Sequence, residues 1–504
     1  MYKRFIILIS LLVVPYAINA KEIKFTILQA NDVYEMSPVN GGRYGGLARV
    51  TTVMKQLKAE NPNFISILAG DLYSPSAIGT AVVNGEKLRG KQMVDVLNKM
   101  GWDYFTLGNH EFDNGEEALI DRLAESKFKT ITSNIRQAST CRTVNNRAQR
   151  ASDCRLFPNT KDIDVIRIDG VKIGIAAITL QALAKDFVAI SDPEQEAKRV
   201  VKRLRKRKRA KLVLMMTHQG MEEDKVFAEE VDGIDLILGG HEHENNYVRR
   251  GDNFTPVAKA DSNARSVYIH RVTYDTKTKA VQIDSDLKVI DASIKEDPVI
   301  KRVVDRWTQL AFDGFKAAGE DPDALVANVT EDLDGLESSV RNKSTRFTEL
   351  VGQSAIRAMP GSELSIVNGG GIRIDDVLTP LQPVTGYDMI RTFPFSGTTY
   401  AQAKITGSTL QDAFNQGNAS AGAGSYLHHE NVSQNADGSW MINGEPLDPS
   451  RVYTAAVMAF LVDVGDDGLD MLVASKNPNN VQLTDLTRAD ARRALINELQ
   501  ATYP

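Results

Sequence analysis

Short apolar runs alternate, along the first half of the chain, with segments whose apolar positions recur every three or four residues. The short runs have the length and composition of buried strands, and the periodic segments have the spacing of helices that bury one face. The predicted strands are 23–29, 64–68, 104–107, 173–180, 212–216 and 234–238, and the clearest predicted helices are 47–57 and 93–100. This alternation predicts a layered α/β domain.

A longer helical pattern follows at Asp297-Pro298, a pair suited to the first turn of a helix. Its apolar stripe is formed by Val299, Val303, Val304, Trp307 and Leu310. Further runs at 364–367, 400–405 and 453–458 predict the strands of a second domain. Because 504 residues exceed what one hydrophobic core usually serves, we expect two domains, a first at 21–297 and a second at 325–504, joined by a linker helix at 298–324. Residues 1–20 are predicted to be a signal peptide.

The first twenty residues have the form of a secretory signal peptide. Lys3 and Arg4 precede an apolar block, 5–14, and the small residue Ala20 comes before the polar Lys21. The alternative, a membrane anchor, needs about 18 or more apolar residues, and this block is shorter. No later segment is apolar enough to span a bilayer. We therefore expect cleavage near Ala20 and a periplasmic or secreted protein without a membrane anchor.

Charge and cysteines narrow the class of protein further. Removal of Lys3 and Arg4 leaves 58 basic against 65 acidic residues, a formal charge of −7, which argues against a nucleic-acid partner. Cys141 and Cys154 lie in a polar, turn-rich segment, where an oxidising compartment favours a disulfide over two free thiols. We expect a monomer, with a dimer as the alternative.

A dense basic run occupies residues 198–209. Its apolar residues, Val200, Val201 and Leu204, have helical spacing, which predicts a surface helix with a charged outer face. The alternative is an electrostatic patch for anions or a polyanionic surface.

Polar side chains follow five of the predicted strands at the point where each strand ends. They are Asp32, Asp71, the pair Asn109-His110, His218, and the pair His241 and His243, so that four of the seven histidines lie at strand ends. Because ligands bind at the carboxyl ends of strands in α/β sheets, we expect these five loops to meet above a single sheet edge. Carboxylate, amide and imidazole groups without thiolates suit divalent Zn, Mn or Mg.

These residues carry a resemblance to a known family. The motifs Asn31-Asp32, Gly70-Asp71, Gly108-Asn109-His110-Glu111, His218 and Gly240-His241-Glu242-His243, in this order, resemble those of the calcineurin-like metallophosphoesterases. Together with Gly-Gly-Leu-Ala-Arg at 45–49, the segment 108–113 narrows the resemblance to the secreted 5′-nucleotidase and UDP-sugar hydrolase family. The resemblance implies an N-terminal β-sandwich flanked by helices, a linker helix and a C-terminal α/β nucleotide-binding domain.

The resemblance also implies a catalytic site with two divalent ions, of Zn, Mn, Mg or Co. Asp32 and His243 would hold one ion, Asn109, His218 and His241 the other, and Asp71 would bridge them. Such a pair of ions clamps a phosphoryl oxygen and activates a water for in-line attack. His110 would face the phosphate, with Asp113 fixing its orientation.

One residue departs from the family pattern. The usual motif at the first strand is Asp-x-His with both residues as ligands, and here Tyr34 stands at the histidine position. A neutral phenol, whose ordinary pKa is near 10, is a poor ligand. The first ion would therefore have fewer protein ligands, extra water or a tyrosinate partner.

The resemblance places the nucleotide in the second domain. A purine would stack between Phe395 and Phe460, although either ring could instead belong to the core. The other implied substrate-binding residues are Arg346 and Arg373 on the ribose and phosphate side, Asn368 at the base and Asp467 at the ribose. Rotation about the linker helix would open and close the cleft between the domains.

The activity implied by the resemblance is metal-dependent hydrolysis of nucleoside 5′-monophosphates such as AMP, for nucleotide salvage. One alternative is action on a UDP-sugar, a nucleoside di- or triphosphate or a 2′,3′-cyclic nucleotide on the same scaffold. Another is a catalytically silent nucleotide-binding protein that lost its first metal through Tyr34.

Overall fold

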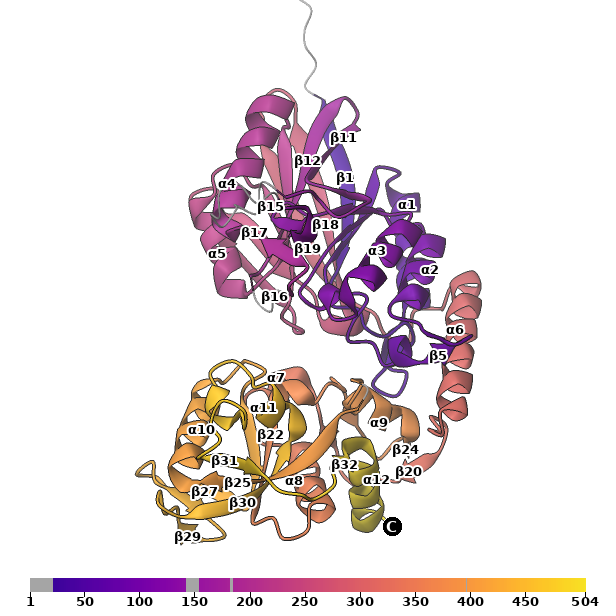
Figure 1. Ribbon diagram of the computed structural model, residues 1–504. Coiled ribbons are helices and arrows are strands. Elements are labelled where there is room, and N and C mark those ends of the chain that lie inside the picture. Colours follow the sequence, from indigo (N-terminus) through magenta and orange to yellow (C-terminus); the bar gives the residue numbers. More distant parts are fainter. Residues whose placement is uncertain (1–20, 142–153, 182–184, 396) are drawn as a thin grey trace, which may run out of the picture.

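The computed structural model describes residues 21–141, 154–181, 185–395 and 397–504. The predicted signal peptide, 1–20, lies outside these residues. Figure 1 shows two bodies of mixed sheets and helices, with helix α6 (Pro298–Ala317) running along one side between them. One hydrophobic core is formed by residues that precede this helix in the sequence, and a separate core by residues that follow it. These two cores confirm the two-domain α/β fold.

The N-terminal body is a sandwich of two sheets. The first has the order β10-β8-β7-β4-β1-β18-β19 and the second the order β11-β12-β14-β15-β17-β16. The first comprises β10 (Thr160–Lys161), β8 (Lys129–Ile131), β7 (Tyr104–Thr106), β4 (Phe64–Ala69), β1 (Glu22–Ala30), β18 (Ser266–Asp275) and β19 (Val281–Val289), and the second comprises β11 (Ile163–Ile168), β12 (Val171–Thr179), β14 (Leu212–His218), β15 (Leu236–Gly240), β17 (Thr255–Lys259) and β16 (Asn246–Arg250). All six strands predicted for this domain are present.

The inner faces of the two sheets form one core, in which Ile27 and Ile67 of the first sheet pack with Ile175 and Leu214 of the second. Helices cover the outer faces: α1 (Leu47–Glu60), α2 (Lys91–Met100) and α3 (Gly115–Glu125) on the first sheet, and α4 (Pro193–Lys202) and α5 (Met221–Glu230) on the second. Because both faces of each sheet are covered, the strands read as nearly continuous apolar runs.

The basic run at 198–209 continues α4 into one turn of π-helix, Arg203–Lys208. Val200, Val201 and Leu204 are buried, as the predicted surface helix requires. Two of its arginines, Arg199 and Arg203, pair with Asp162, so part of its charge is neutralised within the domain.

Helix α6 differs from its predicted form in length and in its buried face. It ends at Ala317, seven residues before the predicted boundary at 324, where Gly319 has a φ of 86°. Its buried residues are Ile300, Val303, Val304, Ala311 and Phe315. Val299 and Leu310, which the predicted stripe includes, are 51% and 37% exposed, because the stripe that faces α1 and α2 begins one residue later.

The C-terminal domain has a sheet of order β26-β22-β30-β25-β31, with β32 paired to β25. Its strands are β26 (Leu427–Glu430), β22 (Leu364–Asn368), β30 (Val452–Met458), β25 (Thr399–Thr406), β31 (Val481–Leu483) and β32 (Ala489–Asp490), and its longer helices are α8 (Arg346–Ala358), α9 (Gly386–Thr392), α10 (Gly407–Ala419) and α12 (Ala491–Thr502). The three strands predicted here are present. Helices α8 and α12 pack against each other beside the sheet.

Two further predictions concern covalent structure and membranes. Cys141 and Cys154 form a disulfide, as predicted, with their Cα atoms 4.2 Å apart. In the part of the chain that the structure describes, no helix combines the length and apolarity needed to cross a bilayer.

Candidate functional site

The predicted site residues come from the ends of strands in both sheets of the sandwich. Asp32, Asp71 and Asn109 follow β1, β4 and β7 of the first sheet, whereas His218 ends β14 and His241 follows β15 of the second. The expectation of a single sheet edge is therefore wrong. The two sheets lie face to face with these ends at the same rim, and the apolar runs of the sequence do not reveal which sheet a strand joins.

The backbone turns sharply where these side chains leave the strands. Asp32, Asp71 and His241 have φ values of 51°, 55° and 87°, in the left-handed region that costs a non-glycine residue about 1–3 kcal/mol. A Cβ atom on Gly108 would lie 2.2 Å from Asp71 Oδ1. The glycine thus allows the close approach of the two loops, and the strain fixes the direction of the carboxylates.

The first part of the cluster, which we call the His218 site, consists of Asp71, Asn109, His218 and His241. Nε2 of His218 lies 3.2 Å from Asp71 Oδ2 and 3.2 Å from Asn109 Oδ1. Its Nδ1 lies 2.8 Å from the carbonyl oxygen of Ala69, which orients the ring. The ring of His241 lies 5.4 Å from that of His218, centroid to centroid.

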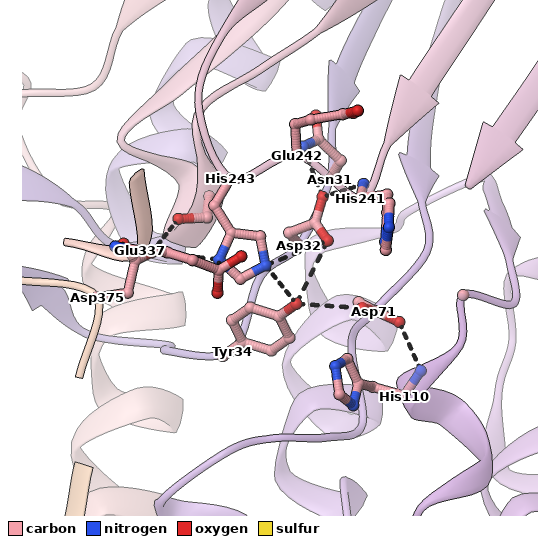
Figure 2. Close-up of polar contacts among 12 residues, drawn as sticks. Asn31, Asp32, Tyr34, Asp71, His110, His241, Glu242, His243, Glu337 and Asp375 are labelled. Atoms are coloured by element: carbon pink, nitrogen blue, oxygen red, sulfur yellow. Dashed lines mark hydrogen bonds and ion pairs between the residues drawn. The ribbon is translucent and has the colours of Figure 1, made fainter. Parts of the chain in front are cut away.

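The second part, which we call the His243 site, consists of Asp32, Tyr34 and His243. Figure 2 shows the phenol of Tyr34 pointing into the cluster. Its hydroxyl lies 3.3 Å from Asp32 Oδ1, 3.1 Å from Asp71 Oδ2 and 3.0 Å from His243 Nε2. On the far side of the imidazole, Nδ1 lies 3.0 Å from Glu337 Oε2 of the C-terminal domain.

The two parts together contain a group of side chains that fits a divalent ion. Among the described residues, the ligand atoms of Asp32, Asp71 and His218 lie within 4.8 Å of one another and could hold a metal. Oxygen and nitrogen donors of this kind suit Zn, Mn, Mg or Co. Asp71 and His218 of the His218 site and Asp32 of the His243 site therefore form one group that fits an ion. The hydroxyl of Tyr34 lies against this group, 3.3 Å from Asp32 Oδ1 and 3.1 Å from Asp71 Oδ2.

The charges of the cluster are strongly coupled. Burial alone would lower the pKa of His218, but Asp71 and Asp32 raise it to about 10. Burial likewise opposes the charge on His243, and Glu337, followed by Asp375, raises its pKa to about 10. The buried carboxylates thus attract positive charge, which a protonated imidazole or a cation can supply.

His110 lies beside the cluster and faces the second domain. Its backbone N–H donates to Asp71 Oδ1 at 3.0 Å, and its Nδ1 lies 2.7 Å from Asp113 Oδ2. Its Nε2 lies 3.3 Å from a guanidinium nitrogen of Arg373. The structure therefore brings the predicted pair of His110 and Asp113 together, and places Arg373 of the C-terminal domain at the same point.

Several residues near the site have no role in the sequence prediction. The carboxylate of Glu111 accepts hydrogen bonds from the backbone N–H groups of Asp71, Leu72, Tyr73 and Gly108, which ties two ligand loops together. The sequence signal that could have identified Glu111 is its place inside the Gly-Asn-His-Glu motif.

Glu337 and Arg341 join the site from the second domain. Arg341 pairs with Glu337 at 2.7 Å, and Glu337 also lies 3.7 Å from Arg373. Nothing in the local sequence marks these two residues, because only the contact between the domains brings them near His243.

The predicted nucleotide-binding residues differ in their exposure and in their partners. Phe395 and Phe460 are 41% and 47% exposed, which excludes the alternative that they are core residues. The guanidinium of Arg346 lies 3.5 Å from Glu331 and 3.2 Å from Glu349.

The two polar residues predicted to contact the nucleoside both donate hydrogen bonds to Asp466. The side-chain amide of Asn368 donates to Asp466 Oδ2 at 2.8 Å, and the backbone N–H of Asp467 donates to Asp466 Oδ1 at 2.9 Å. Asn368 and Asp467 therefore lie close together, as a shared role at one nucleoside requires.

Comparisons with known proteins agree with this architecture. Residues 25–245 match the family model for the calcineurin-like phosphoesterases, and residues 326–474 match that for the 5′-nucleotidase C-terminal domain. The chain is 25% identical to the 5′-nucleotidase of Bos taurus over 96% of this chain and 90% of that protein. It is 26% identical to protein UshA of Yersinia enterocolitica, over 89% and 86% of the two chains.

A solved structure supports the fold. The 5′-nucleotidase precursor of Thermus thermophilus superposes with a TM-score of 0.76 at 20% identity, covering 95% of this chain and 97% of the other.

Proposed function

Since this chain belongs to the calcineurin-like phosphoesterases that carry a 5′-nucleotidase C-terminal domain, we propose that it hydrolyses nucleoside 5′-monophosphates. The substrates would be compounds such as AMP, and the products a nucleoside and inorganic phosphate. The predicted signal peptide supports action in the periplasm or outside the cell, where release of phosphate makes nucleosides available for salvage.

The observation that carries this proposal is the position of Asp71 between His218 of the metal-type cluster and His110, which lies beside Arg373. Its Oδ2 lies 3.2 Å from His218 Nε2 in the His218 site, and its Oδ1 accepts the backbone N–H of His110 at 3.0 Å. A phosphoryl group at the metal-type cluster would therefore lie beside His110 and Arg373.

The His218 site would hold a divalent ion through Asp71, Asn109, His218 and His241. When bound, such an ion polarises a phosphoryl oxygen and lowers the pKa of a water molecule. The second ion that the sequence predicts, between Asp32 and His243, would meet the hydroxyl of Tyr34.

Arg373 would supply positive charge, and His110 a hydrogen bond, to the phosphoryl oxygens. Asp113 fixes the imidazole at Nδ1, so that Nε2 is directed toward Arg373 of the C-terminal domain. Donors that are already oriented in a buried site stabilise the developing charge without reorganisation.

The second domain would choose the substrate. The exposed rings of Phe395 and Phe460 are free to stack on a base, which contributes about 1–3 kcal/mol per base. Asn368 and Asp467 would contact the base and the ribose. Arg346 and Arg373 would reach the ribose and phosphate side, and Arg341, which pairs with Glu337 beside His243, would add positive charge near the cluster.

Hydrolysis of AMP by the purified chain, with Mn, Zn, Co or Mg added, tests the proposal. Asp71→Asn should lower kcat/KM by at least about 100-fold because it removes a carboxylate from the ligand cluster, and His110→Ala should lower kcat by about 100- to 1,000-fold. Asp305→Asn, on the exposed face of α6, is the matched control and should keep wild-type activity. Wild-type activity in Asp71→Asn would refute the proposed site.

The alternative substrates are tested with the same readout. A panel of UDP-sugars, nucleoside di- and triphosphates and 2′,3′-cyclic nucleotides separates them from the monophosphates. Nucleotide binding measured by calorimetry, without release of phosphate under any of the four metals, would instead establish the silent nucleotide-binding protein.

A further inference from the structure

The basic run that begins at Lys198 has no part in the proposed hydrolysis. Residues 198–211 include ten basic and no acidic residues. Four of the ten form ion pairs: Lys198 with Glu194, Arg199 and Arg203 with Asp162, and Arg205 with Asp235. The other six are exposed and form no ion pair with a carboxylate of the described residues; they are Lys202, Lys206, Arg207, Lys208, Arg209 and Lys211.

A neighbouring hairpin adds two cations to this surface. Arg167 of β11 lies opposite Lys172 of β12, and residues opposite each other on antiparallel strands point to the same face of the sheet. The ammonium of Lys172 donates to the backbone carbonyl of Lys208 at 2.8 Å, which places the pair directly beside the run. We call the surface formed by Arg167, Lys172 and the segment 202–211 the basic pole.

This concentration of one charge costs the isolated protein stability. Like charges directly opposite each other on paired strands are destabilising, and neighbouring exposed cations repel one another. After removal of residues 1–20 the chain has 58 basic and 65 acidic residues, a formal charge of −7, so carboxylates are in excess elsewhere. An anionic partner would remove the repulsion that the carboxylates of the described residues leave uncompensated.

The basic pole lies at the end of the sandwich opposite the metal-type cluster. Lys211 immediately precedes β14, and His218 ends that strand. The seven residues of β14, at about 3.3 Å each, separate the two ends by roughly 23 Å. The C-terminal domain lies at the end that carries His218 (Figure 1), so the basic pole is left uncovered.

The chain also enters the fold at the basic pole. The ammonium of Lys21 lies 3.5 Å from Asp169, in the turn that joins β11 to β12. The predicted signal peptide, 1–20, is therefore attached at this end of the N-terminal domain. Because the apolar block of a signal peptide associates with the membrane during export, the basic pole would face the bilayer at that stage.

We propose that the basic pole binds the surface of a membrane that contains anionic phospholipids. Clusters of about four to eight lysines and arginines are attracted to such surfaces. A flat surface meets only this end of the molecule, whereas a nucleic acid would also approach the acidic faces and be repelled there. The metal-type cluster and the C-terminal domain would point away from the membrane, toward soluble substrates. This inference does not depend on the proposed hydrolysis.

Binding of the mature chain, without residues 1–20, to sedimented vesicles tests the inference. At low salt the protein should bind vesicles with about 30% phosphatidylglycerol at least about tenfold more tightly than vesicles of phosphatidylcholine alone. Sodium chloride at about 0.5 M should abolish the difference, because it screens interactions between exposed charges. Equal binding to the two kinds of vesicle, or binding that salt does not weaken, would overturn the inference.

Two variants that lose the same charge locate the binding surface. The pole variant carries Lys206→Gln, Arg207→Gln, Lys208→Gln and Arg209→Gln, and should bind phosphatidylglycerol vesicles at least about tenfold more weakly than the wild type. The control variant removes four exposed cations outside the basic pole, and should keep wild-type affinity; its substitutions are Lys288→Gln, Arg302→Gln, Lys404→Gln and Arg493→Gln. Equal affinity of the two variants would contradict a role for the basic pole.

Two further measurements separate membrane binding from other roles of these cations. In buffer the pole variant should unfold at the same temperature as the wild type or higher, because it loses repulsion between like charges. A lower unfolding temperature than that of the control variant would show that the cations serve the fold, and would overturn the inference. Binding to double-stranded DNA as tight as that to the vesicles, at the same salt, would overturn the assignment to a membrane.

Discussion

The histidines of this chain fall into two groups whose protonation differs because their neighbours differ. His218 and His243 lie among carboxylates, which raise the pKa of each to about 10 against the effect of burial. His270 and His428 are buried without carboxylate partners, and burial lowers the pKa to about 3 and about 4. At neutral pH the second pair is neutral and structural.

His428 should make the protein less stable in mild acid. Its pKa of about 4 in the folded chain lies below the ordinary value of about 6.5, so between these values the unfolded chain takes up a proton that the folded chain does not. The stability that it contributes is complete above pH 6.5 and is lost as the pH falls toward 4. From pH 7 to pH 5 the loss should be about 2 kcal/mol.

Urea denaturation of the wild type and His428→Gln at both pH values measures this contribution. The glutamine does not titrate, so the variant should lose about 2 kcal/mol less than the wild type over this interval. Equal losses in the two proteins would show that His428 is protonated without cost.

At the scale of elements, helix α6 is defined by its cap and by its contact with the first domain. The side chain of Asp297 accepts the backbone N–H groups of Val299 and Ile300, each at 3.1 Å, and pairs with Lys55 of α1. Near the other end, a Cβ atom on Gly314 would lie 2.4 Å from the carbonyl oxygen of Val82. The helix is thus attached along its length to the N-terminal domain.

Removal of this cap should destabilise the helix that joins the domains. Asp297→Ala leaves two N–H groups of the first turn without their acceptor, and should lower the free energy of unfolding by about 0.5–2 kcal/mol in urea denaturation. Asp305→Ala, in the middle of the same helix, removes an exposed ion pair with Lys301 and should cost at most about 0.5 kcal/mol. Equal effects of the two substitutions would contradict a capping role.

At the scale of the whole molecule, polar contacts close the second domain over the site. The hydroxyl of Tyr387 donates to Glu35 Oε2 at 2.8 Å, and Asp376 accepts the backbone N–H of Asn40 at 3.0 Å. Arg391 lies 3.7 Å from Glu35 across the interface and 2.9 Å from Asp376 within its own domain. Interfaces of this polar kind permit relative motion of domains, as gating of the cleft requires.

Loss of one of these contacts should favour an open arrangement. Tyr387→Phe removes a hydrogen bond to a buried carboxylate, worth about 1.5–3 kcal/mol, which shifts the ratio of closed to open molecules by about tenfold or more. Small-angle scattering should show a larger radius of gyration, and KM for the nucleotide should rise. Tyr400→Phe, in the core of the C-terminal domain, is the control and should leave scattering unchanged. Identical scattering for wild type and Tyr387→Phe would show that this contact does not hold the domains together.

The amino-acid sequence alone determined the elements and the kinds of ligands. The strand at 64–68, the helix at 93–100 and the polar residues at strand ends are visible because periodicity and composition are properties of neighbouring residues. The resemblance to the family's Asp-x-His motif, and not the local pattern, identified Tyr34 as a departure.

Only the tertiary structure decided where these elements meet. It distributed the ligand strands over two sheets, because strand pairing joins residues far apart in the sequence and apolar runs do not encode the partner. It brought Glu337 and Arg341 to His243 through contact between domains, and it directed the hydroxyl of Tyr34 among Asp32, Asp71 and His243. The direction of a side chain in a crowded site depends on everything packed around it, and that is known only once the chain has folded.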